Sequence, residues 1–521
     1  MALSGYTVIT AALAYLLYSV VIVIYRLFFH TLARFPGPKI AAATAWYETY
    51  HDLKPPGGQF MKRINELHNI YGPIVRISPE EVHIRDSKFV EVLFAGPGQG
   101  KRDKHVAGAH AAGTPQGVFG TQAHDVHRRR RAALNPLFSK TGAAAAESMI
   151  YDKADLLLRR VDEQIIRDGF SDLRKVFAAL AVDVVSEYIS GRSAGLLEDE
   201  AKTTQWHDSI RTLAYAIPVV RQFNWLMPLS MAIPRGLMDR LAPKMALANG
   251  VHNEREAEAR IAIQLQAQDQ LTQKSSDYRA APLQHLAVYR TLLSNDVLPP
   301  SEKEYNRMSH EAVTILAAGG ETTTSALTAA VYFVYSDKGT ILPKLLVELG
   351  SLINDENPRP PISKLEKLPY LTAVIKETLR ITTLTGRLTR VAPENTLTYG
   401  KWSIPAGTAI GMNLRDVSLD PEIFPEPTKF DPERWLPGNP NLDLCNRYYM
   451  PFSRGTRACV GLNVAYAELY IVLATIFRAV DFDLHDTVRE RDVDFVRDFF
   501  IGETSADARG VRVKYGSSRT I

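Results

Sequence analysis

The apolar residues of the chain form one long uncharged run at the amino terminus and shorter periodic runs elsewhere. Residues 1–25 carry no charged side chain, and residues 6–25 alone supply the ~20 mostly apolar residues that a helix needs to cross a bilayer. A cleaved signal peptide is the alternative, but such a peptide has a basic first region and an apolar core of only ~7–15 residues. Four basic residues follow the run: Arg26, His30, Arg34 and Lys39. They favour a retained anchor, residues 1–34, with the rest of the chain in the cytosol.

After the anchor the pattern changes from helical to extended. Phe35-Pro36-Gly37-Pro38 ends any continuing helix, because a proline ring is incompatible with a helix interior. Residues 71–77 and 81–84 alternate apolar and polar side chains on either side of Ser78-Pro79, which predicts two short strands. Residues 96–120 are rich in Gly, Ala and His and have no period, so they predict a loop long enough to be functional.

The longest helical pattern beyond the anchor covers residues 301–336, roughly 50 Å at ~1.5 Å per residue. Ser301 and Glu304 have the spacing of a capping box at its start. The middle of the pattern, Ala318-Gly319-Gly320-Glu321-Thr322-Thr323, is poor helix sequence, since each glycine costs ~1 kcal/mol relative to alanine. Two explanations stay open: a functional site on this helix, or a bent helix packed against another backbone.

Residues 196–281 are helical in tendency and have a strongly apolar middle. Its members are Trp206, Leu213, Ile217, Phe223, Trp225, Leu226, Met227 and Leu229. An ordinary core and a mobile lid over a substrate site both fit this pattern.

Composition excludes several functional classes. Sixty-one Lys and Arg against 57 Asp and Glu give a formal charge of +4, too mild to indicate a nucleic-acid partner. The two cysteines, Cys445 and Cys459, are too few for a disulfide framework or a zinc cluster and fit a reducing compartment. Cys445 has no motif around it and is interpreted as a structural or surface thiol. A prior of ~150 residues per domain suggests three domains, but no Pro-, Gly- or Ser-rich linker divides residues 35–521, which we therefore treat as one.

Cys459 lies in a loop that opens onto a helix-forming run, residues 462–477. A thiolate at that position lies near the positive end of a helix dipole, which predicts a lowered pKa and a cysteine suited to bind a metal. Gly461 leaves room for a flat cofactor, and Phe452 shields the sulfur from water. Arg457 has the bidentate fork that suits a carboxylate of such a cofactor. A lone buried cysteine in a loop is the alternative.

The spacing Phe-x-x-Gly-x-Arg-x-Cys-x-Gly, residues 452–461, resembles the haem-binding loop of the cytochrome P-450 family. Three more stretches resemble family motifs in the family's order: residues 318–323, Glu377-Thr378-Leu379-Arg380, and Phe430-Asp431-Pro432-Glu433-Arg434-Trp435. The resemblance implies a mainly α, triangular fold with small β-sheets. Haem would lie between the long helix and the cysteine loop, behind one amino-terminal transmembrane helix. The proline-rich hinge and the run 134–139 resemble the fungal, membrane-anchored, trichodiene-oxygenase-like branch.

The resemblance also implies a role for each matching residue. Cys459 would be the axial ligand of the iron in haem b, with Phe452 and Gly461 around it. Haem propionates would be bound by Arg131, Arg390 and Arg457, and by His127 at the family's tryptophan position. In a widened turn of the long helix, Thr322 would hydrogen-bond dioxygen or its water and Glu321 would relay protons. Glu377, Arg380 and Arg434 would form a structural network.

The basic run 127–131 has two other interpretations, a nuclear signal and a solvated helix face. The family resemblance adds that its remaining arginines could face the negatively charged electron donor. The implied activity is a monooxygenase that uses O2 and electrons from NADPH-cytochrome P-450 reductase, with cytochrome b5 as a further candidate donor. Its substrate would be an apolar terpenoid or polyketide of fungal secondary metabolism. The catalytic domain would lie on the cytosolic side of the endoplasmic reticulum membrane. No nucleic-acid partner is expected. Rearrangement or coupling without oxygen insertion, and a non-catalytic anchored haem protein, are the alternatives.

Overall fold

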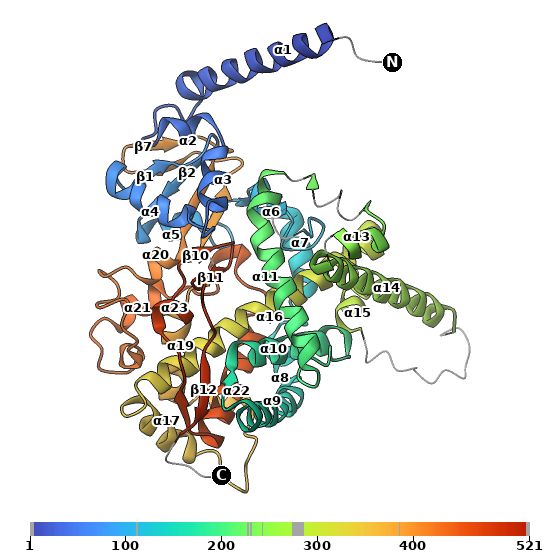
Figure 1. Cartoon of the computed structure of the whole chain (residues 1–521), viewed down its shortest axis with the longest axis vertical. Coiled ribbons are helices and arrows are strands. Elements are labelled where there is room, and N and C mark those ends of the chain that lie inside the picture. Colours follow the sequence, from blue (N-terminus) through green and yellow to red (C-terminus); the bar gives the residue numbers. More distant parts are fainter. Residues whose placement is uncertain are drawn as a thin grey trace.

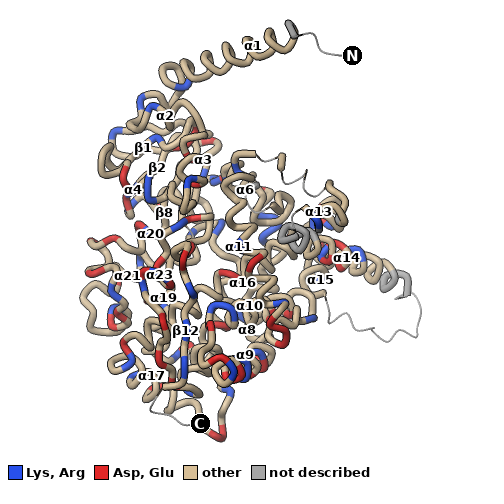
Figure 2. The backbone as a smooth tube through the Cα atoms, viewed as in Figure 1, with Lys and Arg blue, Asp and Glu red and all other residues tan. Residues whose placement is uncertain are grey.

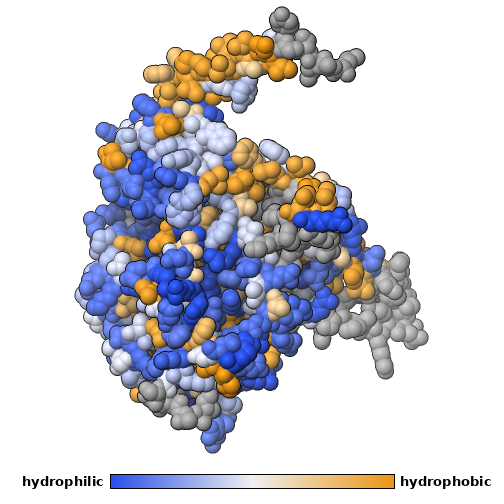
Figure 3. Space-filling model, in the orientation of Figure 1, coloured by the Kyte–Doolittle hydropathy of each residue, from blue (hydrophilic) through white to orange (hydrophobic). Residues whose placement is uncertain are grey.

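The amino-terminal helix projects from the body of the protein. The computed structural model describes residues 5–516 except 111–112, 224, 227–228, 230–231, 242, 273–285 and 385. Helix α1 (Gly5–Ile24) continues into a π-helical turn (Tyr25–Phe29), and Thr7–Phe29 is long and apolar enough to cross a membrane. Figure 2 shows α1 without charged residues, and Figure 3 shows hydrophobic side chains along its length. The predicted anchor is therefore confirmed as a candidate span.

The hinge after the anchor is tied to the body by short contacts. The backbone N–H of Arg76 donates to Pro36 O at 2.7 Å, and the Arg76 guanidinium donates to Arg26 O at 2.9 Å. Gly37 has φ +153°, and a Cβ there would lie 2.4 Å from Arg76 O, so only glycine fits. Phe35 stacks on Trp402 with ring centroids 5.0 Å apart. The anchor thus leaves the body at a fixed point.

Helices make up most of the body (Figure 1). The shorter helices are α2 (Lys39–Ala43), α3 (Trp46–Leu53), α4 (Phe60–Tyr71), α5 (Val90–Leu93), α6 (Val106–His110), α7 (His124–Leu134), α8 (Lys140–Ala144), α13 (Arg235–Leu241), α15 (Ala287–Leu293), α17 (Ile341–Gly350), α18 (Ile362–Leu365), α19 (Pro369–Ile381), α20 (Leu414–Ser418), α21 (Leu442–Tyr448) and α23 (Arg489–Asp492). The longer helices are α9 (Glu147–Asp168), α10 (Leu173–Ser190), α11 (Glu200–Gln222), α14 (Pro243–Thr272), α16 (Tyr305–Ser336) and α22 (Leu462–Ala479).

The strands are short and form small sheets. A five-stranded sheet has the order β1 (Ile74–Arg76), β2 (Glu81–Ile84), β8 (Ala409–Asn413), β5 (Arg387–Val391), β3 (Asp103–Lys104), and only its β2–β8 pair is parallel. The smaller sheets pair β4 (Ser171–Asp172), β12 (Arg512–Tyr515) and β9 (Phe482–Leu484), then β10 (Arg497–Asp498) with β11 (Gly502–Glu503), and β6 (Leu397–Tyr399) with β7 (Trp402–Ile404). The mainly α fold with small sheets and the two strands predicted within residues 71–84 are confirmed.

Helix α16 is the central element of the main core. It packs against α10, α14, α19 and α22, and its second half is almost fully buried. Helix α22 packs against α8, α9, α16, α17, α18 and α19, so it is a core helix, although its apolar composition would also suit a membrane span. Cys445 is fully buried and its Sγ faces Ile423 O at 3.6 Å, so of the two interpretations of this thiol the structural one is correct.

Two local predictions are wrong. Residues 301 and 304 form no capping box, because a 3-10 turn (Pro300–Glu302) precedes α16 and Glu302 instead binds Arg130 and Arg307. The loop predicted for residues 96–120 contains β3 and α6. Within the predicted apolar middle of residues 196–281, Trp225 and Leu229 are exposed, whereas Met227 and residues 273–281 lie outside the described residues.

Candidate functional site

The cysteine loop has a conformation that depends on its glycines. Gly455 has φ +76°, and a Cβ there would lie 2.4 Å from the carbonyl oxygens of Phe94 and Ala95. The Cys459 N–H donates to Phe452 O at 2.9 Å, which fixes the cysteine backbone. At Gly461, the residue before α22, an added Cβ would lie 4.0 Å from the Cys459 sulfur, an ordinary contact distance.

The Cys459 thiol is accessible, yet its surroundings are those of an interior. Burial raises the pKa of this thiol, while the Gly461 N–H and the charge of Arg131 act in the opposite direction. The predicted lowering of the pKa is therefore wrong for the polypeptide alone, because desolvation outweighs the helix terminus. An accessible thiol whose pKa is raised by burial is in the position expected of a ligand to an internal cofactor.

The opposite wall expected for such a site is the middle of α16. Ala317 and Ala318 are exposed, although Leu316 and Gly320 beside them are buried. On the other side of the helix, Cβ atoms at Gly319 and Gly320 would lie 3.0 and 2.9 Å from the side chains of Val185 and Val182 of α10. The glycines thus permit close helix packing, as the structural alternative predicted, while small alanines leave the exposed face open.

Thr322 and Glu321 point to different surroundings. The Thr322 hydroxyl donates to Ala318 O at 2.8 Å, one turn back along α16. Helix α16 is α-helical from Tyr305 to Ser336, so the widened turn implied by the family resemblance is not present. Glu321 is buried against Arg174 of α10, which also lies 3.3 Å from Glu503 of β11. Burial raises the pKa of Glu321, and Arg174 opposes the rise.

A cluster of basic side chains lies beside the cysteine loop, which we call the basic cluster. It consists of Lys104, His127, Arg131, Arg390 and Arg457. Arg131 donates to the carbonyls of Ala458 and Cys459, and Arg457 donates to those of Arg102, Thr121 and Gln122. Lys104 donates to Phe119 O at 2.9 Å, and Arg390 to Thr389 O at 3.1 Å. The structure therefore brings together all four basic residues that the sequence singled out, and adds Lys104.

Among the described residues no acid forms an ion pair with the basic cluster, and the one nearby acidic charge is that of Asp103, which acts on Arg457. Burial, with Arg457 nearby, lowers the pKa of Arg390 to about 9, and burial lowers the pKa of Arg457 to about 10. Burial and the neighbouring cations lower the pKa of His127 to about 2. Buried charge without a partner is costly, so this arrangement calls for an anionic ligand. The carboxylates of a haem fit it, next to a cysteine sulfur that fits the iron.

Glu377 is the centre of a second charged group, which we call the Glu377 network. Arg380 binds the Glu377 carboxylate in bidentate fashion at 2.7 and 2.8 Å, and Arg434 Nε lies 3.4 Å from it. The Trp435 indole N–H donates to the same carboxylate at 2.9 Å, a contact that the sequence did not indicate. Arg380 also donates to Ser418 O and Pro427 O. The network connects α19 to the segment that precedes the cysteine loop.

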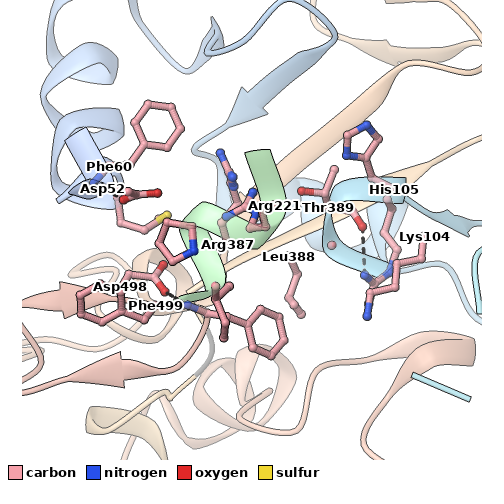
Figure 4. A pocket seen from close by; sticks show the side chains of 16 residues that line it. Asp52, Phe60, Lys104, His105, Arg221, Arg387, Leu388, Thr389, Asp498 and Phe499 are labelled. Carbon is pink, nitrogen blue, oxygen red and sulfur yellow. Dashed lines mark hydrogen bonds between the residues drawn. The ribbon is translucent and has the colours of Figure 1, made fainter. Parts of the chain in front are cut away.

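A pocket lies between β5, α11 and the β10–β11 hairpin (Figure 4). It is lined by apolar residues such as Phe60, Ile217 and Phe499, and also by charged ones. Phe499 and Phe500 also line this pocket. Of its charged members the sequence indicated only Arg390. Sequence reasoning missed the others, because they come from five distant segments and belong to no motif.

The fold and this site point to a haem-binding protein, and the comparison with known families agrees. The chain belongs to the cytochrome P450 family, whose model matches residues 44–504. The family implies haem iron and dioxygen, and the protein is an oxidoreductase of the monooxygenase class. The chain is 37% identical over 502 residues to the cytochrome P450 monooxygenase MO6277 of Ascocoryne sarcoides, covering 96% of each.

Two further fungal relatives have names that state a reaction or product. The tryptophan 6-hydroxylase fscE of Fusarium equiseti is 37% identical and covers 94% of this chain and 93% of its own length. The conidiogenone synthase PchP450 of Penicillium rubens is 34% identical and covers 96% and 97%. This chain is thus similar over nearly its full length to monooxygenases with different products.

Proposed function

We propose that this protein is a membrane-anchored fungal monooxygenase that oxidises a small molecule of secondary metabolism with O2 and electrons from an NADPH-dependent reductase. The observation that carries the proposal is an accessible Cys459, whose thiol pKa burial raises, beside a partly buried basic cluster that forms no ion pair with an acid among the described residues. The relatives that hydroxylate tryptophan or form conidiogenone support secondary metabolism as the setting. The exposed apolar helix α1 supports an anchor, with the endoplasmic reticulum as its proposed membrane.

The residues have the following proposed tasks. Cys459 binds the iron, and Arg131, Arg390, Arg457 and His127 hold the propionates, with Lys104 as an added cation. When bound, haem supplies the oxidising chemistry, and a thiolate ligand favours O–O cleavage. Phe452 holds the cysteine through its backbone carbonyl, which accepts the Cys459 N–H.

Two residues of α16 are proposed to handle protons. Glu321 is buried with a raised pKa, so it holds a proton more readily than an exposed glutamate. Thr322, the next residue, carries a hydroxyl that both donates and accepts hydrogen bonds. Arg174 fixes the Glu321 carboxylate, and a swing of this side chain away from Arg174 would carry a proton toward the exposed face of α16.

Carbon monoxide binding to the reduced protein tests the haem-thiolate assignment. We expect the red-shifted absorption of a thiolate-ligated haem, and its loss in Cys459→Ser. A histidine-type spectrum in the wild-type protein would refute the assignment. Cys445→Ser is the matched control, because that thiol is buried in a separate hydrophobic cluster with its Sγ facing Ile423 O, and its loss should leave the spectrum unchanged.

Turnover with purified reductase separates monooxygenation from its alternatives. We expect product formation to depend on NADPH and to incorporate oxygen from labelled O2, with cytochrome b5 as an optional second donor. A product without the label would favour rearrangement or coupling. The substrate itself is best sought by comparing metabolites of the source organism with and without the gene.

A further inference from the structure

The pocket of Figure 4 has an acidic side that the basic cluster does not explain. In that view Asp52 and Asp498 lie at one end, Lys104 and His105 at the other, and Arg387 between them. Lys104 belongs to the basic cluster, which a haem would occupy. The opposite end is therefore free to meet a different group, at the part of the pocket farther from the cysteine loop.

Two arginines that line the pocket, Arg221 and Arg387, already form ion pairs with another carboxylate. Glu48 Oε1 lies 2.8 Å from Arg221 Nη2 and 2.6 Å from Arg387 Nη2. Arg387 Nε also lies 3.7 Å from Glu81. Arg221 and Arg387 thus already face the carboxylates of Glu48 and Glu81. With Asp52 and Asp498 added, this end of the pocket has more acids than arginines.

Asp52 and Asp498 have backbone donors but no ion pair of their own among the described residues. Asp52 accepts the Phe60 N–H at 3.1 Å, and Asp498 accepts the Phe500 N–H at 2.7 Å. Burial and the charges of Glu48 and Asp498 raise the pKa of Asp52 to about 7. Burial raises the pKa of Asp498 as well. Two desolvated carboxylates on one pocket are best compensated by a positive ligand group.

Arg387, in the same pocket, needs a hydrogen-bond acceptor rather than a positive group. Its side chain is 5% exposed, and Nη1 is buried without a hydrogen-bond partner in the described structure. An unmade hydrogen bond of a buried cationic group is costly, so Nη1 calls for an acceptor. Apolar side chains of Phe60, Ile217 and Phe499 line the space around these charges.

We propose that this pocket binds a substrate head group that carries both an amine and a carboxylate, the head of an apolar α-amino acid. The amine faces Asp52 and Asp498, and the carboxylate faces Arg387 Nη1. The apolar body lies against the aromatic lining, Phe60 and Phe499, at the same end of the pocket. This proposal rests on the proposed function, since it names the substrate class of that monooxygenase, and it replaces the fully apolar substrate predicted from the sequence.

Equilibrium dialysis of the haem-loaded full-length protein tests the proposal with four matched probes. L-tryptophan has both charges, tryptamine only the amine, indole-3-propionate only the carboxylate, and indole neither. We expect L-tryptophan to bind at least tenfold more tightly than each of the other three. Equal binding of indole and L-tryptophan, or no binding of L-tryptophan, would overturn the proposal.

Two variants assign the charges to residues. Asp52→Asn keeps an oxygen that can accept the Phe60 N–H, and should weaken L-tryptophan and tryptamine about tenfold while leaving indole-3-propionate unchanged. Arg387→Gln should weaken indole-3-propionate and L-tryptophan but not tryptamine. Asp416→Asn is the matched control, a buried acid outside this pocket whose pKa burial raises to about 6. Uniform losses across all probes in Asp52→Asn would contradict the assignment.

The carbon monoxide spectrum of the same sample separates this proposal from the proposed function. A thiolate-type spectrum together with no head-group preference would overturn the amino-acid proposal alone. A spectrum without the thiolate shift would overturn the proposed function, while dialysis still decides whether the pocket selects the two charges.

Discussion

The Glu377 network and the basic cluster are both rich in arginine and both at least partly buried, but they differ in charge balance. In the network, one carboxylate receives Arg380, Arg434 and Trp435, and the remaining guanidinium donors meet backbone carbonyls. In the cluster, Arg390 and Arg457 donate to carbonyls and form no ion pair among the described residues, and the charge of Asp103 offsets only part of the burial of Arg457.

The difference shows which group is complete in the polypeptide alone. A carboxylate shared by two arginines needs no further partner, so the network can stabilise the fold by itself. Burial lowers the pKa of cations that have no ion pair, so the cluster becomes more favourable with an anion from outside the chain. Charge balance thus separates a structural group from a binding group, although both have the same kind of residues.

Removing the central carboxylate should give the largest effect, because it breaks the network. Glu377→Gln leaves Arg380 and Arg434 buried without a counter-charge, and loss of one partner of a buried pair costs roughly 3–5 kcal/mol. We expect a lower midpoint of chemical denaturation and a low yield of folded protein. Glu433→Gln, at an exposed ion pair with Lys344, is the control. An unchanged midpoint would show that the network is not structural.

Removing a cation from the basic cluster should weaken haem binding but should not destabilise the haem-free protein. Arg390→Gln should reduce the haem content of purified protein several-fold, because a propionate loses its partner. The unfolding midpoint of the haem-free fraction should stay equal or rise, since a guanidinium whose pKa is lowered to about 9 is costly there at neutral pH. A fall in that midpoint as large as in Glu377→Gln would break the distinction between the two groups.

His127 should make the protein sensitive to acid. Its pKa is about 2 in the folded state, below the ordinary value of 6.5, because of burial and the nearby cations. The unfolded state therefore binds the proton first, and the stability present above pH 6.5 is lost progressively as the pH falls toward 2. In His127→Gln, the denaturation midpoint should change less between pH 7 and pH 5 than it does in the wild-type protein. His485→Gln, outside the cluster, should retain the wild-type slope.

The smallest effect should come from the indole contact in the network. Trp435→Phe keeps an aromatic ring but loses the hydrogen bond to Glu377, which a charged acceptor makes worth about 1.5 kcal/mol. Calorimetry or denaturation would measure this loss. A loss as large as that of Glu377→Gln would mean that ring packing, not the carboxylate, holds this region together.

The sequence was sufficient for much of the fold and of the candidate site. An uncharged apolar run of the length of a bilayer predicts the anchor, because helix length and membrane thickness are both fixed. The cysteine loop, Glu377-x-x-Arg380 and the Ala-Gly-Gly-Glu-Thr-Thr stretch are local patterns, and their local geometry follows from their residues. The same reasoning failed for the capping box, since the ion pairs of Glu302 with Arg130 and Arg307 compete for the turn before α16.

Only the tertiary structure decided where charge is balanced. No sequence pattern connects Arg174 with Glu321 and Glu503, Lys104 with the basic cluster, or Asp52 with Asp498 and Arg387, because these residues are tens to hundreds of positions apart. Burial raises the pKa of Cys459 and outweighs the effect of the helix terminus, and burial is a property of the packed chain. The sequence by itself therefore determined the family, the candidate membrane span and the cysteine proposed as ligand, while packing determined which charges remain for a cofactor or a substrate to neutralise.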